Sequence, residues 1–233
     1  MGVVWEPSRP VALHPTHRRH AGPGLRTFEM HRRNTIKWIA GSALLAGAGG
    51  LFSACSSEQK ASFKSVDITG VDYAQGFTLT DFDGRTRTLQ DFKGKAVVIF
   101  FGYTQCPDVC PTTMSEMVQV KQMLGDDGDR LQVLFISVDP ERDTPEVLKA
   151  YMQSFDPSFL ALYAGSPEKL DALARDFKIY YKRVDGKVPG SYSMDHSAAS
   201  YAYDPEGRMR LFIRYGSDVK DVASDIRQLL NGA

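Results

Sequence analysis

Two cysteines, Cys106 and Cys110, stand four positions apart in the stretch GYTQCPDVCPTT, which spans residues 102–113. Each cysteine is followed by a proline, and the apolar run AVVIFF precedes the stretch at residues 96–101. If this segment turns helically, positions i and i+4 lie on one face, so the two sulfurs could converge on one metal ion or react as a dithiol. A structural disulfide is the third alternative, but it would close a very small loop and add little stability by chain entropy.

The part of the chain after Cys55 contains few other side chains that bind soft or borderline metals. Four of the five histidines lie before this residue, which leaves His196, and Cys106 and Cys110 are the two cysteines that follow it. Two thiolates and one imidazole form a donor set that suits copper, because sulfur favours Cu(I) and imidazole also accepts Cu(II). Zinc is an alternative if carboxylates complete the site, because structural zinc takes four protein ligands.

The N-terminal 55 residues have the features of a targeting segment. Residues 31–37 read HRRNTIK and resemble a twin-arginine signal, residues 38–52 carry no charge, and LFSAC ends at Cys55. A positive flank, a short apolar stretch and small residues before a cysteine are typical of an exported lipoprotein, in which Cys55 would be lipidated. An uncleaved transmembrane anchor is the alternative. Both predict a membrane tether, with the body on the periplasmic side of a bacterial inner membrane.

The chain divides by composition into four segments. Residues 1–29 are expected to be a start-site artefact or a disordered extension, because an export signal normally starts at its own basic flank. Residues 30–55 form the signal or anchor, residues 56–65 a polar tether, and residues 66–233 one globular domain.

The charges are unevenly distributed along the chain. Seven of the 28 basic residues but two of the 28 acidic residues precede Cys55, so the body carries five more acids than bases. Such a net acidic body lacks the excess of basic residues that binds nucleic acid.

Strands and helices alternate after the tether. Hydrophobic runs predict strands at 77–80, 86–89, 96–101, 131–138, 160–164, 199–203 and 209–214 and a hairpin arm at 178–184, and helical spacing predicts helices at 111–124, 144–154, 166–177 and 218–230. Thr113 and Glu116 predict a capping box in the first helix. The order predicts an α/β, thioredoxin-like fold: a mixed, mostly parallel central sheet flanked by helices, with an N-terminal β-hairpin and a hairpin insertion around residues 178–194.

This fold would bring the candidate residues to one edge of the sheet. Cys106 is expected in the loop after a buried strand and Cys110 near the start of the next helix, where open α/β sheets carry their sites and a helix N-terminus favours thiolate. Asp139 ends the neighbouring strand and could orient a ligand, although an Asp-Pro pair is also ordinary turn chemistry. His196 stands just before a predicted strand and could join the cysteines, because strand ends and loops gather around the cysteine loop in this fold.

Three stretches together resemble the SCO/SenC family of copper chaperones: GYTQCPDVCPTT, ISVDPERDTPE and MDHSAASYAYDPEG. The resemblance covers residues 65–230 and implies a thioredoxin-like, membrane-tethered protein that binds one copper ion. It implies Cys106, Cys110 and His196 as the copper ligands and a supporting role for Asp139. Gln105 stands where many family members have histidine.

The resemblance also implies partners. The family helps to assemble the binuclear copper A centre of cytochrome c oxidase, so the partner would be the oxidase subunit that carries this centre, with another copper chaperone or a thiol reductase as further partners. The alternative function is a thiol–disulfide oxidoreductase that reduces the copper-site cysteines of that subunit, with Cys106 and Cys110 as its redox-active pair. A peroxide-reducing enzyme is a weaker alternative, because the threonine and arginine that usually activate its cysteine are not evident.

Overall fold

The computed structural model describes residues 62–233, so the predicted export signal, the lipidation site Cys55, residues 1–29 and most of the tether lie outside the described residues. The strands are β1 (Val66–Asp67), β2 (Thr78–Asp81), β3 (Thr86–Thr88), β4 (Ala96–Gly102), β5 (Leu131–Ser137), β6 (Leu160–Tyr163), β7 (Tyr181–Asp185), β8 (Tyr192–His196), β9 (Ser200–Tyr203) and β10 (Met209–Ile213). The α-helices are α1 (Val109–Leu124), α2 (Pro145–Gln153), α3 (Pro167–Asp176) and α4 (Val219–Leu230).

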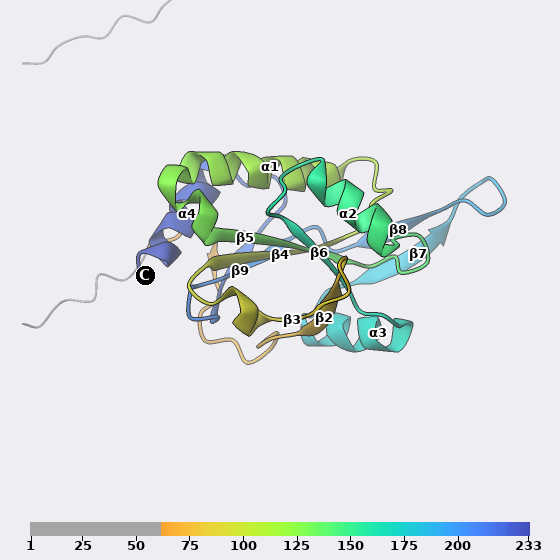
Figure 1. Cartoon of the computed structure of the whole chain (residues 1–233), viewed down its shortest axis with the longest axis horizontal. Helices are drawn as coiled ribbons and strands as arrows, with labels where there is room; N and C mark the ends of the chain where they lie inside the picture. Colours follow the sequence, from red (N-terminus) through yellow and green to blue (C-terminus); the bar gives the residue numbers. More distant parts are fainter. Residues whose placement is uncertain (1–61) are drawn as a thin grey trace, which may run out of the picture. The chain divides into compact units, whose positions relative to one another are not determined.

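Eight of these strands form one sheet in the order β1-β10-β9-β4-β5-β6-β2-β3, and β7 and β8 pair separately. In Figure 1, α1, α2 and α4 lie on one face of the large sheet and α3 lies on the other. The predicted α/β, thioredoxin-like class with its mixed sheet is thereby confirmed. The parallel part is smaller than predicted, because within residues 62–233 the β4–β5 and β5–β6 pairings of this sheet are parallel and the other five are antiparallel. Tight turns force antiparallel pairing within the β2–β3 hairpin and within the β9–β10 hairpin, and each hairpin also joins its neighbour in the sheet, β6 or β4, in the antiparallel direction.

The two central strands carry the site at their carboxyl ends. Every residue of β4 and β5 is buried, as expected for continuous apolar runs that are covered on both faces. Full burial of a side chain such as Phe100 contributes about 1.5–3 kcal/mol. The strands are in parallel register from Ala96 opposite Leu131 to Gly102 opposite Ser137, so their last residues lie side by side. The loops that follow, one with the cysteines and one with Asp139, therefore start at the same edge.

Helix α1 begins two residues earlier than predicted, at Val109. The predicted capping box at Thr113 and Glu116 is wrong, because Thr113 lies inside the helix and its hydroxyl donates to the carbonyl oxygen of Val109 at 2.8 Å. A proline at position 111 is compatible with the early start, since the first-turn N–H groups of a helix have no intrahelical acceptor. The earlier start places Cys110 in the first turn of the helix rather than before it.

Strands β7 and β8 form the predicted hairpin insertion. They pair over their whole length, from Tyr181 opposite His196 to Asp185 opposite Tyr192, and Figure 1 shows the hairpin extending away from the large sheet. His196 stands shortly before β9, as expected, and it is also the last residue of β8. None of the helices within residues 62–233 combines the length and the hydrophobicity that a membrane span requires.

Candidate metal centre

The cysteine loop, the first turn of α1 and the end of β8 meet at one point. Cys106, Cys110 and His196 each offer one ligand atom, and these three atoms all lie within 4.8 Å of one another. Two of the residues come from neighbouring positions in the chain, whereas His196 is 86 residues from Cys110. The structure therefore brings together the three residues that the sequence marked as candidate ligands. Such a group could hold one metal ion.

The imidazole of His196 is oriented by the backbone of the next residue, Ser197. Its Nδ1 atom lies 2.9 Å from the carbonyl oxygen of Ser197, and because a carbonyl only accepts, Nδ1 must carry the proton. The lone pair of Nε2 then faces the Sγ atom of Cys110 at 3.4 Å. The ring packs edge-on against Phe100 at 5.9 Å and Tyr103 at 5.8 Å between ring centroids. Burial lowers the pKa of His196, which favours the neutral form that binds metals.

The two sulfurs differ in their surroundings. Cys110 is completely buried, whereas Cys106 is partly exposed. The backbone N–H of Cys110 donates to the Sγ atom of Cys106 at 3.4 Å, and both residues are free thiols. Burial raises the pKa of Cys110, so this thiol holds its proton unless a cation compensates the charge. Cys106 is therefore the sulfur that a reagent or a partner can reach first.

Gly102, at the end of β4, leaves the space that Cys110 occupies. A Cβ atom at this position would lie 2.9 Å from the Sγ atom of Cys110 and less than 3 Å from ring atoms of Phe100 and Phe135. The backbone cannot move away easily, because Gly102 pairs with Ser137 in the centre of the sheet. The close approach of a strand to the sulfur thus requires glycine, and sequence analysis did not single this residue out.

A family model for SCO1/SenC matches residues 67–231, which is more than half of the chain. The chain belongs to the SCO1/SenC family. The resemblance of the three sequence stretches is thereby confirmed.

This SCO1/SenC protein has relatives in mitochondria and in bacteria. The mitochondrial SCO2 homologue of Bos taurus is 34% identical over 213 residues, which are 89% of this chain and 76% of that protein. The structure of Bradyrhizobium japonicum ScoI, described with copper bound, is similar at 41% identity and a TM-score of 0.60, covering 66% of this chain and 97% of that one. A SCO1/SenC family lipoprotein of Bacillus anthracis is similar at 28% identity and a TM-score of 0.57, covering 66% and 92%.

In this SCO1/SenC protein, the carboxylate of Asp139 bonds to Arg142 and Tyr192 and not to a candidate ligand. Its carboxylate accepts hydrogen bonds from Nε of Arg142 at 2.5 Å and from the hydroxyl of Tyr192 at 2.8 Å. Asp143 reaches the cysteine loop instead, because its oxygens accept from the hydroxyls of Thr104 and Ser137, each at 2.6 Å. Burial raises the pKa of Asp143. Asp143 was not predicted as a site residue, although it stands four residues after Asp139 in the same loop.

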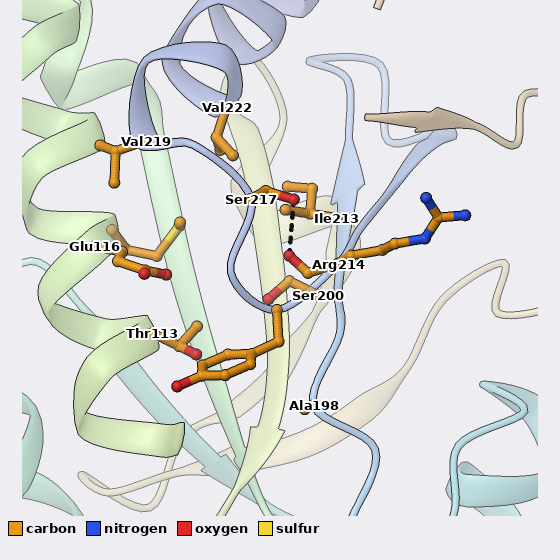
Figure 2. A pocket seen from close by; sticks show the side chains of 11 residues that line it. Thr113, Glu116, Ala198, Ser200, Ile213, Arg214, Ser217, Val219 and Val222 are labelled. Atoms are coloured by element: carbon orange, nitrogen blue, oxygen red, sulfur yellow. Dashed lines mark hydrogen bonds between the residues drawn. The ribbon is translucent and has the colours of Figure 1, made fainter. Parts of the chain in front are cut away.

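The SCO1/SenC chain also has a small cavity about one helical turn beyond the cysteines. Figure 2 shows Thr113 and Glu116 of α1 facing Ser200 of β9 and the segment before α4, where the hydroxyl of Ser217 donates to the carbonyl oxygen of Arg214 at 2.8 Å. Burial raises the pKa of Glu116. The cavity encloses about 10 Å³, close to the minimum for one water molecule. This cavity is therefore too small for a cofactor.

Proposed function

We propose that this protein binds one copper ion through Cys106, Cys110 and His196 and delivers it to the copper A centre of cytochrome c oxidase. The observation that carries this proposal is the convergence of two sulfurs and one imidazole nitrogen within 4.8 Å. Sulfur donors suit Cu(I) and imidazole also accepts Cu(II), so the donor set fits both oxidation states. The proposal is further supported by the related ScoI structure, which is described with copper bound.

The unequal exposure of the sulfurs supports delivery. Transfer by ligand exchange requires one donor that a partner can replace while the others still hold the ion. Cys106 is partly exposed, whereas Cys110 is buried behind it and His196 is half-buried. Cys106 would therefore be the ligand that a cysteine of the oxidase subunit replaces first. Another copper chaperone that loads the site, or a thiol reductase that keeps it reduced, would approach from the same side.

The proposal predicts that the reduced protein binds one copper ion per chain and gives it to the copper-free domain of the oxidase subunit. The measurement is copper content of both proteins after mixing and separation. Cys106→Ser and Cys110→Ser are each expected to lose binding, because the remaining sulfur and imidazole cannot hold the ion against a competing chelator. A wild-type protein that keeps its copper in the presence of the oxidase domain would contradict delivery, and one that binds no copper would contradict the site.

A thiol–disulfide oxidoreductase is the second candidate, favoured by the two free thiols of which one is partly exposed. In that reaction, the thiolate of Cys106 attacks a disulfide of the oxidase subunit and forms a mixed disulfide. The thiol of Cys110 then attacks the sulfur of Cys106 in this bond and passes its proton to the leaving thiolate, which releases the reduced subunit and leaves an oxidised pair that an external dithiol reduces. Catalytic turnover of a protein disulfide by the copper-free protein would favour this enzyme. Stoichiometric exchange alone would leave copper delivery as the better explanation.

We also propose that the domain of residues 66–233 works outside the cytoplasm, tethered at the periplasmic face of the inner membrane. The basic and apolar segment at 30–55 supports export, and residues 56–65 have the polar composition of a tether. The related protein of Bacillus anthracis is described as a lipoprotein. Residues 1–29 would not contribute to the tether.

A lipoprotein tether predicts that the mature chain starts at Cys55 and carries lipid there, because small residues precede this cysteine as at a lipoprotein cleavage site. The measurement is the intact mass of the protein extracted from its own membranes. Cys55→Ser is expected to block both cleavage and lipidation. A free thiol at Cys55 in an uncleaved chain would instead establish the transmembrane anchor, and a chain recovered without membranes would contradict both.

A further inference from the structure

Arg142, in the loop after β5, connects the cysteine loop to the hairpin that carries His196. Its Nη1 atom donates to the side-chain oxygen of Gln105 at 3.1 Å and to the backbone carbonyl oxygen of Tyr192 at 2.9 Å. Gln105 is the neighbour of Cys106, and Tyr192 begins the strand that ends at His196. One guanidinium group thus holds both segments that supply the candidate ligands.

The same guanidinium makes cation–π contacts with two aromatic rings. Its central carbon is 3.5 Å from the ring centroid of Tyr192 and 5.6 Å from that of Tyr103, which itself packs edge-on against His196. The carboxylate of Asp139 fixes Arg142 from one end through Nε and fixes Tyr192 through its hydroxyl. The Arg142 side chain is 18% exposed, so these contacts are largely shielded from water. This arrangement depends on a planar group that stacks on a ring and carries several N–H donors, and lysine has no such group.

The hairpin needs this attachment, because it is not part of the large sheet. Within residues 62–233, β7 and β8 share ladder hydrogen bonds with each other and not with the other eight strands. His196, at the last position of β8, pairs with Tyr181 of the same hairpin, so side-chain contacts must hold this hairpin against the cysteine loop. Tyr192 and Met194 provide two of these contacts, since Tyr192 is bonded to Asp139 and Met194 is buried.

We propose that Arg142 is a positioning residue that clamps the β7–β8 hairpin against the cysteine loop and so sets the distance between His196 and the two sulfurs. The inference rests on the proposed function, because it concerns the imidazole as a ligand of the same copper site. A positioning role predicts that loss of Arg142 removes nitrogen coordination while both sulfur ligands stay in place. A general contribution of Arg142 to the stability of the fold would not predict this selective loss.

The test is Arg142→Met, which keeps the length of the aliphatic stem and removes every hydrogen-bond donor of the guanidinium. Cu(II) affinity, measured by competition with a chelator, is expected to fall about 10–100-fold, the usual effect of removing an outer-shell partner. The nitrogen hyperfine splitting in the electron paramagnetic resonance spectrum of the Cu(II) protein is expected to weaken. Arg142→Lys, which keeps the charge beside Asp139, is expected to fold and to show a smaller loss of the same kind.

Arg183→Met is the matched control, because Arg183 stacks on the other side of the Tyr192 ring at 3.8 Å and pairs with Glu141 and Asp185 at the surface. Arg183→Met is expected to bind Cu(II) within about twofold of wild type, as exposed ion pairs contribute little to stability.

Wild-type Cu(II) affinity and hyperfine splitting in both Arg142 variants would overturn the inference, as would an equal loss of affinity in Arg183→Met. If His196→Ala lost copper but the Arg142 variants did not, the positioning role of Arg142 would be refuted and His196 would still be a ligand. Unchanged copper binding in His196→Ala would overturn the proposed function itself.

Discussion

Replacing His196 with alanine is expected to lower the affinity for Cu(II) at least about a hundredfold, because binding energies of about 10–16 kcal/mol for a four-ligand zinc site imply several kcal/mol for each ligand. The structure explains why no other nitrogen would compensate. Nε2 of His196 faces Cys110 at 3.4 Å, and the sequence contains no further histidine after Cys55. Cu(I) affinity is expected to fall less, since two sulfurs satisfy most of the demand of this softer ion.

The measurement is a chelator competition under anaerobic conditions with both thiols reduced. Reactivity of the thiols serves as the internal control, because disulfide exchange needs Cys106 and Cys110 but not the imidazole. The rate at which iodoacetamide labels Cys106, the exposed member of the pair, is therefore expected to stay close to that of the wild type. Unchanged Cu(II) affinity in a variant with intact thiols would remove His196 from the ligand set.

The parts of the site that depend on local sequence could be predicted. The apolar run of residues 96–101 and the prolines after the cysteines predict a strand, a loop and a helix in this order. The structure has this order, with β4 followed by the cysteine loop and α1. This order alone places Cys106 and Cys110 at the carboxyl end of a central strand. His196 stood out as the histidine that follows Cys55, and the family resemblance then implied it as a ligand, whereas its local pattern indicated only a nearby strand.

The parts of the site that depend on tertiary packing could not be predicted. Arg142 and Asp143 stand in a loop whose Asp-Pro-Glu-Arg-Asp sequence reads as ordinary turn chemistry, and only the fold shows that they reach Tyr192 and Thr104. The extent of parallel pairing was overestimated for a similar reason. Alternation of strands and helices fixes the direction of β4, β5 and β6, but it does not show where the terminal hairpins join the sheet.

Gly102→Ala is expected to affect both stability and the metal site, because the added methyl group has no space. Its Cβ atom would meet Phe100 Cε1 at 2.7 Å, Phe135 Cε2 at 2.8 Å and Cys110 Sγ at 2.9 Å. All three residues are completely buried, and real Cβ atoms essentially never approach other atoms so closely. Overpacking of this kind typically costs about 1–3 kcal/mol of unfolding free energy. Because the rings are confined by the sheet, we expect the sulfur to be displaced and copper affinity to fall.

Gly76→Ala is the matched control for this substitution. A Cβ atom at Gly76 would meet no heavy atom within 4 Å, and Gly76 is not among the glycines with positive φ, so the backbone accepts alanine. Its unfolding free energy is expected to stay within about 1 kcal/mol of wild type, with any gain coming from the less flexible unfolded chain. The measurements are denaturant unfolding of the metal-free protein and Cu(II) competition for both variants. If Gly102→Ala matched Gly76→Ala in unfolding free energy and in Cu(II) affinity, the contact between β4 and Cys110 would not constrain the sulfur of Cys110. The position of this sulfur would then have to be fixed by α1 alone.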